Sequence, residues 1–223
     1  MKKGLMIGAT LLMGLSLAAC GNSKVDNGDG ASSSSAVSKN KASSSKEVTN
    51  GSPEKVGQWK YFEDFDANGT LEKVNTFNKE VKQGDVTVTI KNVKVYSMKP
   101  KNDNAKKIAS EYFNASGVNN PYYVVQVNWS AKNAGSEELQ TNGLENIVTN
   151  KGQQIDTGSG LQDAGTGATV ASGASSEFEA NGLIKGATAK DINKLTLKFG
   201  SICTTSDYTD VSPEVTGIEL DLK

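Results

Sequence analysis

The sequence contains neither histidine nor arginine among its 223 residues, and all 24 basic residues are lysines. Without histidine the chain cannot form a Ser-His-Asp or Cys-His catalytic centre, nor a metal site with imidazole ligands. Without arginine it lacks the bidentate guanidinium clamp for phosphate and carboxylate groups. Its formal net charge of -1 provides no excess of positive charge for a nucleic-acid partner, and we expect none.

The amino-terminal segment begins with two positive charges and continues without any. Lys2 and Lys3 precede an apolar stretch over residues 4–17, which is short for a membrane-spanning helix. A positive head, a short apolar run and small residues before a cleavage point are typical of a secretory signal peptide. We predict a signal peptide over residues 1–19, with an uncleaved anchor helix as the alternative.

Four residues close this segment, Leu17-Ala18-Ala19-Cys20, and they resemble the lipobox of bacterial lipoproteins at every position. The resemblance implies diacylglycerol transfer to the Cys20 thiol, cleavage before it, and anchoring by acyl chains such as palmitate. Each buried methylene contributes roughly 0.8 kcal/mol, so two or three chains hold a protein durably on a bilayer. We therefore expect the protein at the extracytoplasmic face of a bacterial cell membrane. The alternative is an ordinary signal peptide in which the cysteine is incidental.

We predict that residues 20–56 comprise the lipidated cysteine and a low-complexity tether. Ten of residues 21–56 are serine and none is aromatic. Such a segment cannot bury enough apolar area to offset the entropy of its own ordering, so we predict disorder. The tether either spaces a domain from the membrane through a wall layer or serves only as a linker.

Alternating apolar and polar residues dominate the remaining chain, residues 57–223, and predict a mainly β domain. The alternation predicts strands over residues 85–95, 122–132, 146–149, 153–156, 177–180, 194–199 and 217–222. Within the first strand the apolar series slips by one position after Ile90, which predicts a bulge near residues 91–92. Apolar residues three and four apart predict one short helix over residues 103–113.

This order of elements resembles the Ig-like, telokin-like domain of Gram-positive surface lipoproteins. The resemblance rests on the hydrophobic pattern of residues 78–200, with Tyr-Tyr-Val-Val-Gln-Val-Asn-Trp at 122–129 as its clearest strand. It implies an antiparallel Ig-like β-sandwich with one short helical insertion, exposed at the cell surface and concerned with binding. We divide the domain into a hairpin extension at residues 57–78 and a sandwich at 79–223.

One polar cluster matches the first half of a calcium-binding loop. Its candidate oxygen ligands are Asp64, Asp66, Asn68 and Glu72. At the twelfth position, where a bidentate glutamate is expected, the chain has Asn75. The favoured interpretation is therefore a hairpin with its turn at Asn68-Gly69, and we predict no metal or cofactor.

Aromatic residues make up only 6% of the chain, and one group precedes the sandwich. Trp59, Tyr61 and Phe62 form either an exposed stacking platform for a ligand or an edge strand packed on the domain, which we favour. Glu177 and Glu179 lie two apart on one strand face. Such carboxylates could serve a hydrolase or be ordinary surface acids.

Cys203 has no disulfide partner if Cys20 carries lipid, and we interpret it as a small buried residue on a strand. Taken together, these features favour a lipid-anchored surface protein that binds a cell-surface protein or wall polymer without catalysis. A carboxylate-dependent hydrolase of wall polymers and an accessory subunit of a membrane complex are the alternatives.

The anchoring hypothesis predicts that Cys20→Ser releases the protein. The serine variant cannot accept the diacylglycerol thioether, so fractionation should find it in spent culture medium, whereas the unaltered chain pellets with envelopes. Mass spectrometry of the mature amino terminus should find the lipid on residue 20. A serine variant that still pellets with envelopes would contradict the anchoring hypothesis.

Overall fold

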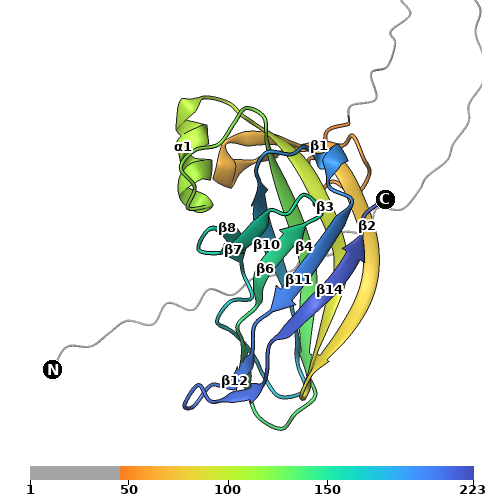
Figure 1. Ribbon diagram of the computed structural model, residues 1–223, viewed down its shortest axis with the longest axis vertical. Helices are drawn as coiled ribbons and strands as arrows, with labels where there is room; N and C mark the ends of the chain where they lie inside the picture. The colour runs from red at the N-terminus through yellow and green to blue at the C-terminus, as the bar shows by residue number, and fades with distance from the viewer. Residues whose placement is uncertain (1–45) are drawn as a thin grey trace, which may run out of the picture. The chain divides into compact units, whose positions relative to one another are not determined.

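The computed structural model describes residues 46–223, so the signal peptide and Cys20 lie outside the described residues. Most of this part of the chain is strand (Figure 1). The larger sheet has the spatial order β1 (Trp59–Phe62), β2 (Ala67–Gln83), β3 (Val86–Pro100), β4 (Tyr122–Asn133), β10 (Ser175–Ile184), β8 (Gly160–Asp163), β7 (Gln154–Thr157), β6 (Leu144–Thr149), β11 (Lys194–Phe199) and β14 (Val215–Asp221). The smaller sheet has the order β13 (Asp210–Ser212), β12 (Ile202–Thr204), β5 (Leu139–Thr141) and β9 (Ala168–Val170). The helical elements are η1 (Glu63–Phe65), α1 (Asp103–Tyr112) and η2 (Ala189–Asp191).

The larger sheet folds over on itself and encloses the main hydrophobic core. One wall of the core comes from the inward faces of β3 and β4, with residues such as Val95 and Val127, and the other comes from β6, β11 and β14. Trp129 is fully buried between them, against Phe178 and Phe199. The predicted mainly β sandwich is therefore confirmed. Its strand pairs are antiparallel except for the short β7–β8 pair, which is parallel.

A second hydrophobic cluster covers the opposite face of the same sheet at one end. Alternate residues of β3 and β4, including Tyr96, Met98 and Val124, point away from the main core. Helix α1 covers them with Ala109, and Phe113 follows at its carboxyl end. Helix α1 and β1 lie at the same end of the domain, far along the strands from β12 (Figure 1). Strands β3 and β4 are therefore buried on both faces there.

Several local predictions are confirmed. The bulge lies between Ile90 and Asn92 of β3. The helix occupies Asp103–Tyr112, where the side chain of Asn102 accepts a hydrogen bond from the backbone N–H of Ala105 at its start. Strands β6 and β7 form the expected hairpin. Cys203 is buried on β12.

The amino-terminal predictions require correction. Asn68 and Gly69 lie inside β2, because η1 supplies the turn between β1 and β2. Strand β2 then continues to residue 83 paired with β3, so residues 57–78 are not a separate extension. The predicted tether also ends earlier than residue 56, since the backbone N–H of Val48 donates to the Trp59 carbonyl. A Gly at position 69 suits the strand, because a Cβ there would lie 2.5 Å from the Phe62 ring.

Side chains close the seam between β2 and β14, the outermost long strands of the folded sheet. Lys79 donates to the Glu219 carbonyl at 3.0 Å, and the buried Gln83 amide donates to the carbonyls of Gly200 and Pro213. Lysines on an edge strand also discourage pairing with another chain. No helix within residues 46–223 combines the length and apolar character needed to cross a membrane.

One partly buried carboxylate ties three segments around Trp129. Asp163 accepts hydrogen bonds from the Trp129 indole at 3.1 Å, from the Leu144 backbone N–H at 2.6 Å and from the Gly165 backbone N–H at 3.1 Å. Gly165 itself lies against the indole, where a Cβ would come within 2.1 Å of the ring. Burial raises the pKa of Asp163 in spite of these donors.

We predict that Asp163→Asn lowers the free energy of unfolding by about 1–3 kcal/mol, because one N–H of the new amide faces a backbone donor. Urea unfolding followed by tryptophan fluorescence measures the change. Asp221→Asn, on the exposed end of β14, is the matched control and should change the unfolding free energy little. Equal effects of the two substitutions would contradict the structural role of Asp163.

The raised pKa of Asp163 also predicts how the destabilisation by Asp163→Asn depends on pH. Because the folded-state pKa of Asp163 is raised, this carboxyl supports the fold most at pH values below its unfolded pKa of about 3.9. Its contribution falls as pH rises through the folded pKa. The difference in unfolding free energy between wild type and Asp163→Asn should therefore narrow as pH rises from below about 3.9 through the folded pKa.

Candidate functional site

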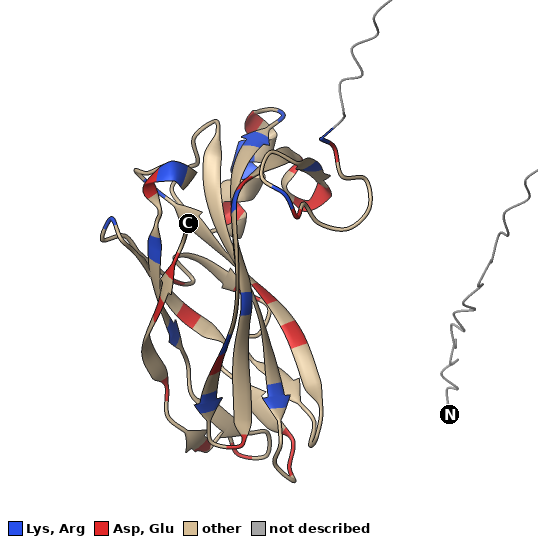
Figure 2. Cartoon of the chain, turned by 90° about the vertical axis from the view of Figure 1, so that its right-hand side faces the viewer, with Lys and Arg blue, Asp and Glu red and all other residues tan. Residues whose placement is uncertain are grey.

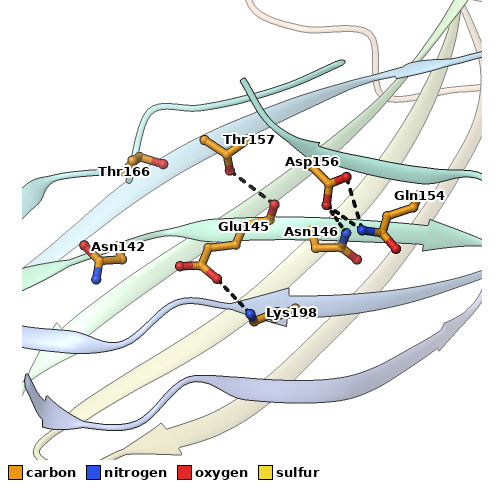
Figure 3. Close-up of a pocket in the computed structure, with 8 residues that line it drawn as sticks. All are labelled: Asn142, Glu145, Asn146, Gln154, Asp156, Thr157, Thr166 and Lys198. Carbon is orange, nitrogen blue, oxygen red and sulfur yellow. Dashed lines mark hydrogen bonds and ion pairs between the residues drawn. The ribbon is translucent and has the colours of Figure 1, made fainter. Parts of the chain in front are cut away.

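A wide polar depression lies on the outer face of β6, β7 and β11 (Figure 3). Its cavity volume is about 500 Å³. Eight polar residues line it: Asn142, Glu145, Asn146, Gln154, Asp156, Thr157, Thr166 and Lys198. We call this surface the polar depression.

Strand register explains how these residues meet. Asn146 of β6 is the direct partner of Asp156 on β7 and of Lys198 on β11. Alternation buries their neighbour Ile147 in the main core, which leaves Asn146 pointing outward. The polar depression is therefore a cross-strand row on the solvent side of a sheet.

Hydrogen bonds hold this row in place. The Asn146 amide donates to Asp156, and the Gln154 amide donates to both Asp156 carboxylate oxygens, at 2.9 and 3.2 Å. The Thr157 hydroxyl donates to the Glu145 carbonyl at 3.2 Å (Figure 3). The side chains are thus ordered before any ligand arrives, which reduces the entropy lost on binding.

The charged residues that line the polar depression are two acids, Glu145 and Asp156, and one lysine, Lys198. The Lys198 ammonium lies 2.6 Å from a Glu214 oxygen and 3.2 Å from a Glu145 oxygen. The hydrogen bond to Glu214 is the largest cause of the raised pKa of Lys198, and the hydrogen bond to Glu145 is the next. Both keep Lys198 protonated. Over the whole domain lysines and acids are interspersed along the strands (Figure 2).

This arrangement offers amide, hydroxyl and carboxylate groups in a wide, shallow cavity. Such groups recognise the hydroxyls and amides of a hydrophilic ligand by direct and water-mediated hydrogen bonds. Among residues 46–223, no aromatic or aliphatic side chain lines this cavity. The polar depression therefore suits a hydroxyl- and amide-rich ligand better than an apolar one.

The predicted calcium ligands do not converge. Asp66 accepts from the Tyr61 hydroxyl at 2.6 Å and lies 3.3 Å from the Lys101 ammonium, and the Tyr61 hydrogen bond is the largest cause of its lowered pKa. Asn68 and Glu72 are exposed on β2. Asp64 lies on η1 beside a different cavity. Within residues 46–223, no three His, Cys, Asp or Glu side chains gather in a way that could hold a metal ion.

The aromatic candidates are divided between the two faces of β1. The Tyr61 ring lies under the Lys101 ammonium at 3.7 Å, and Trp59 is half-buried. Phe62 points the other way and packs edge-on against Tyr96, with ring centroids 5.5 Å apart. Phe62 therefore packs on the domain, as expected for an edge strand. The three rings do not share one face and so do not form a stacking platform.

The acid pair at Glu177 and Glu179 lies on the exposed face of β10. Glu177 forms an ion pair with Lys91, and Glu179 accepts from the Asn181 amide at 2.9 Å. The two carboxylates share one strand face and do not oppose one another across a cleft.

Sequence reasoning missed the polar depression. Its residues come from β6, β7, β11 and two loops, and polar residues on strands are ordinary on any solvent-facing sheet. The hairpin prediction for residues 146–156 is the one signal that places Asn146 beside Asp156. The pairing with β11 depends on tertiary structure that a single sequence does not specify.

We predict that calcium leaves the stability of this protein unchanged. At about 10 mM calcium, a site with the millimolar affinity of extracellular modules would stabilise the fold by about 1.4 kcal/mol, by mass action. Differential scanning calorimetry should show equal unfolding midpoints with calcium, with magnesium and with EDTA. A rise of several degrees with calcium alone would reveal a site in the Asp64 to Glu72 segment, which Asp64→Asn would then abolish.

Comparison with known proteins gives three matches among solved structures. No family model and no curated protein matches the sequence. A solved structure of a functionally unknown protein from Listeria monocytogenes EGD-e aligns with a TM-score of 0.46 and 11% sequence identity. The alignment covers 70% of this chain and 88% of that chain. At this level the likeness carries no conclusion about function.

Proposed function

We propose that this chain is a lipid-anchored, extracytoplasmic bacterial surface protein that acts as a non-enzymatic binding module. The observation that carries the binding role is the polar depression, with Asn146, Gln154 and Asp156 preordered on an open sheet face. The ligand class that fits it is a hydroxyl- and amide-rich wall polymer. The lipobox at Cys20 supports the anchoring, and the Ser-rich segment after it would allow reach into the wall.

A polymer ligand fits better than a protein partner. Stable protein interfaces centre on buried aromatic and aliphatic anchors, which occupy well-packed pockets. The large apolar side chains exposed on residues 46–223 are Val56, Tyr112, Tyr208 and Val211. Val56 and Tyr112 come from separate segments, whereas Tyr208 and Val211 lie three residues apart. None of the four lines the polar depression.

A binding role also fits better than wall-polymer hydrolysis. A glycosidase needs two carboxyl groups on opposite sides of the scissile bond, about 5 Å or more apart. The side chains of Glu177 and Glu179 project from one face of one strand, and Lys91 already neutralises Glu177. In the polar depression Lys198 lies beside Glu145, and amide donors surround Asp156.

The lipid-free chain, residues 20–223 with Cys20→Ser, should co-sediment with purified cell-wall sacculi. The double substitution Asn146→Ala and Asp156→Ala removes adjacent donor and acceptor groups. A hydrogen bond to a neutral group is worth about 0.5–1.5 kcal/mol and one to a charged group about 1.5–3 kcal/mol, so we expect the affinity to fall by at least about tenfold. Sedimentation at a series of sacculus concentrations measures this affinity.

Glu80→Gln is the control, since Glu80 is exposed on β2 and lies outside the polar depression. It should bind sacculi as the unsubstituted chain does. Circular dichroism checks that all variants are folded. Binding of the double variant at full affinity would reject the polar depression as the site, and failure of the unsubstituted chain to bind would reject the wall-polymer ligand.

A further inference from the structure

A small cavity at the α1 end of the domain combines aromatic rings with carboxylates. It lies on the outer side of β3, β4 and β10, opposite the main core, and has a volume of about 130 Å³. Its lining includes four aromatic residues and two acids: Phe62, Phe65, Tyr96, Tyr112, Asp64 and Glu179. We call it the ring pocket, and it shares no residue with the polar depression.

Four rings from four different elements form the walls. Phe62 of β1 meets Tyr96 of β3 at 75°, with centroids 5.5 Å apart. Phe65 of η1 meets Tyr112 of α1 at 80°, with centroids 4.8 Å apart. Four of the residues that line the cavity are therefore aromatic, and aromatic rings attract cations to their faces.

Packing fixes these rings in place. Phe65 stacks on Phe113 at 5.9 Å, and Tyr112 meets the same ring edge-on at 4.8 Å. Phe113 is fully buried, and Tyr96 is only 2% exposed. Tyr112 is 38% exposed, so the cavity opens to solvent along this ring. A ligand would therefore find a preformed cavity with a buried floor.

Two carboxylates stand beside the rings without a counter-charge. Asp64 and Glu179 are exposed, and within residues 46–223 neither forms an ion pair with a lysine. The nearest lysine along the same face of β3 is Lys94, two residues before Tyr96, and Glu54 neutralises it at 2.7 Å.

The ring hydroxyls are sensitive to this negative charge. Burial is the largest cause of the raised pKa of Tyr112, and the charges of Glu179 and Asp64 raise it further. Burial likewise raises the pKa of Tyr96, with Glu179 as the next cause. The carboxylates of Asp64 and Glu179 therefore give the lining of the cavity a negative charge, which favours a positively charged guest.

We propose that the ring pocket binds a quaternary ammonium group. Cations of this kind are attracted to the faces of aromatic rings, and methyl groups on nitrogen fill an apolar cavity while Asp64 and Glu179 balance the charge. The volume fits, since an apolar cavity of about 150 Å³ holds a molecule the size of benzene. Binding involves no covalent step, and the proposal does not depend on the wall-polymer function.

The probe is choline, compared with its neutral carbon isostere 3,3-dimethylbutan-1-ol, on the lipid-free chain of residues 20–223 with Cys20→Ser. Proton NMR titration should shift the N-methyl resonance of choline upfield, because the methyl groups lie over ring faces. The neutral isostere should bind at least about tenfold more weakly, because a cation adds the ring and carboxylate attraction. Equal binding of the two probes, or no binding of choline, would overturn the proposal.

Two isosteric substitutions and one matched control locate the site. Glu179→Gln and Asp64→Asn each remove one charge and should weaken choline binding by about threefold to tenfold. Glu177→Gln removes an equally exposed carboxylate two residues away on the same strand face and should leave binding unchanged. If Glu177→Gln weakened binding as much as Glu179→Gln, the effect would be one of general charge and the ring pocket would be rejected.

Discussion

Strands β3 and β4 carry apolar side chains on both faces at one end, and this constraint organises the rest of the domain. Val95 and Val127 belong to the main core, while Tyr96 and Val124 on the same strands point away from it. A sheet of this kind must be covered on both sides, because water on either face would meet a contiguous apolar surface. The other half of the sandwich covers one face. Helix α1, η1 and β1 cover the other.

The second cover is built from short elements, and its geometry explains the ring pocket. Flat rings at right angles leave space between them that aliphatic side chains of a regular sheet would fill. Phe65 and Tyr112 both rest on Phe113, so the same contacts that fix α1 also shape the cavity. Beyond this cover the outer face becomes polar, through an amide ladder in which Asn128 donates to Asn92 at 2.8 Å. The ring pocket thus marks the boundary between the covered and the solvated parts of one sheet face.

The sequence predicted those features of the fold that depend on residues close together in the chain, and it failed where distant segments pair. Period-two alternation indicated seven strands, namely β3, β4, β6, β7, β10, β11 and β14. The slip after Ile90 located the bulge, and both signals depend on neighbours in the chain. The prediction of a turn at Asn68-Gly69 was wrong, because the dipeptide alone does not reveal that both residues pair with β3 inside β2. The ring pocket and the polar depression each collect residues from several elements. Tyr96 and Tyr112 are ordinary strand and helix residues until the fold brings them to the same cavity.

The two proposed sites differ in which of their side chains can be substituted without disturbing the packing of the domain. In the ring pocket the rings are both walls and structure, so shortening Tyr96 or Phe65 would loosen the cover as well as the cavity. The carboxylates of Asp64 and Glu179 stand at the exposed rim, so their charge can change without a change in packing. In the polar depression the hydrogen bonds of Asn146 join neighbouring strands that backbone pairing already holds. In both sites the outward polar or charged groups can therefore be changed without loosening the two cores that keep them in place.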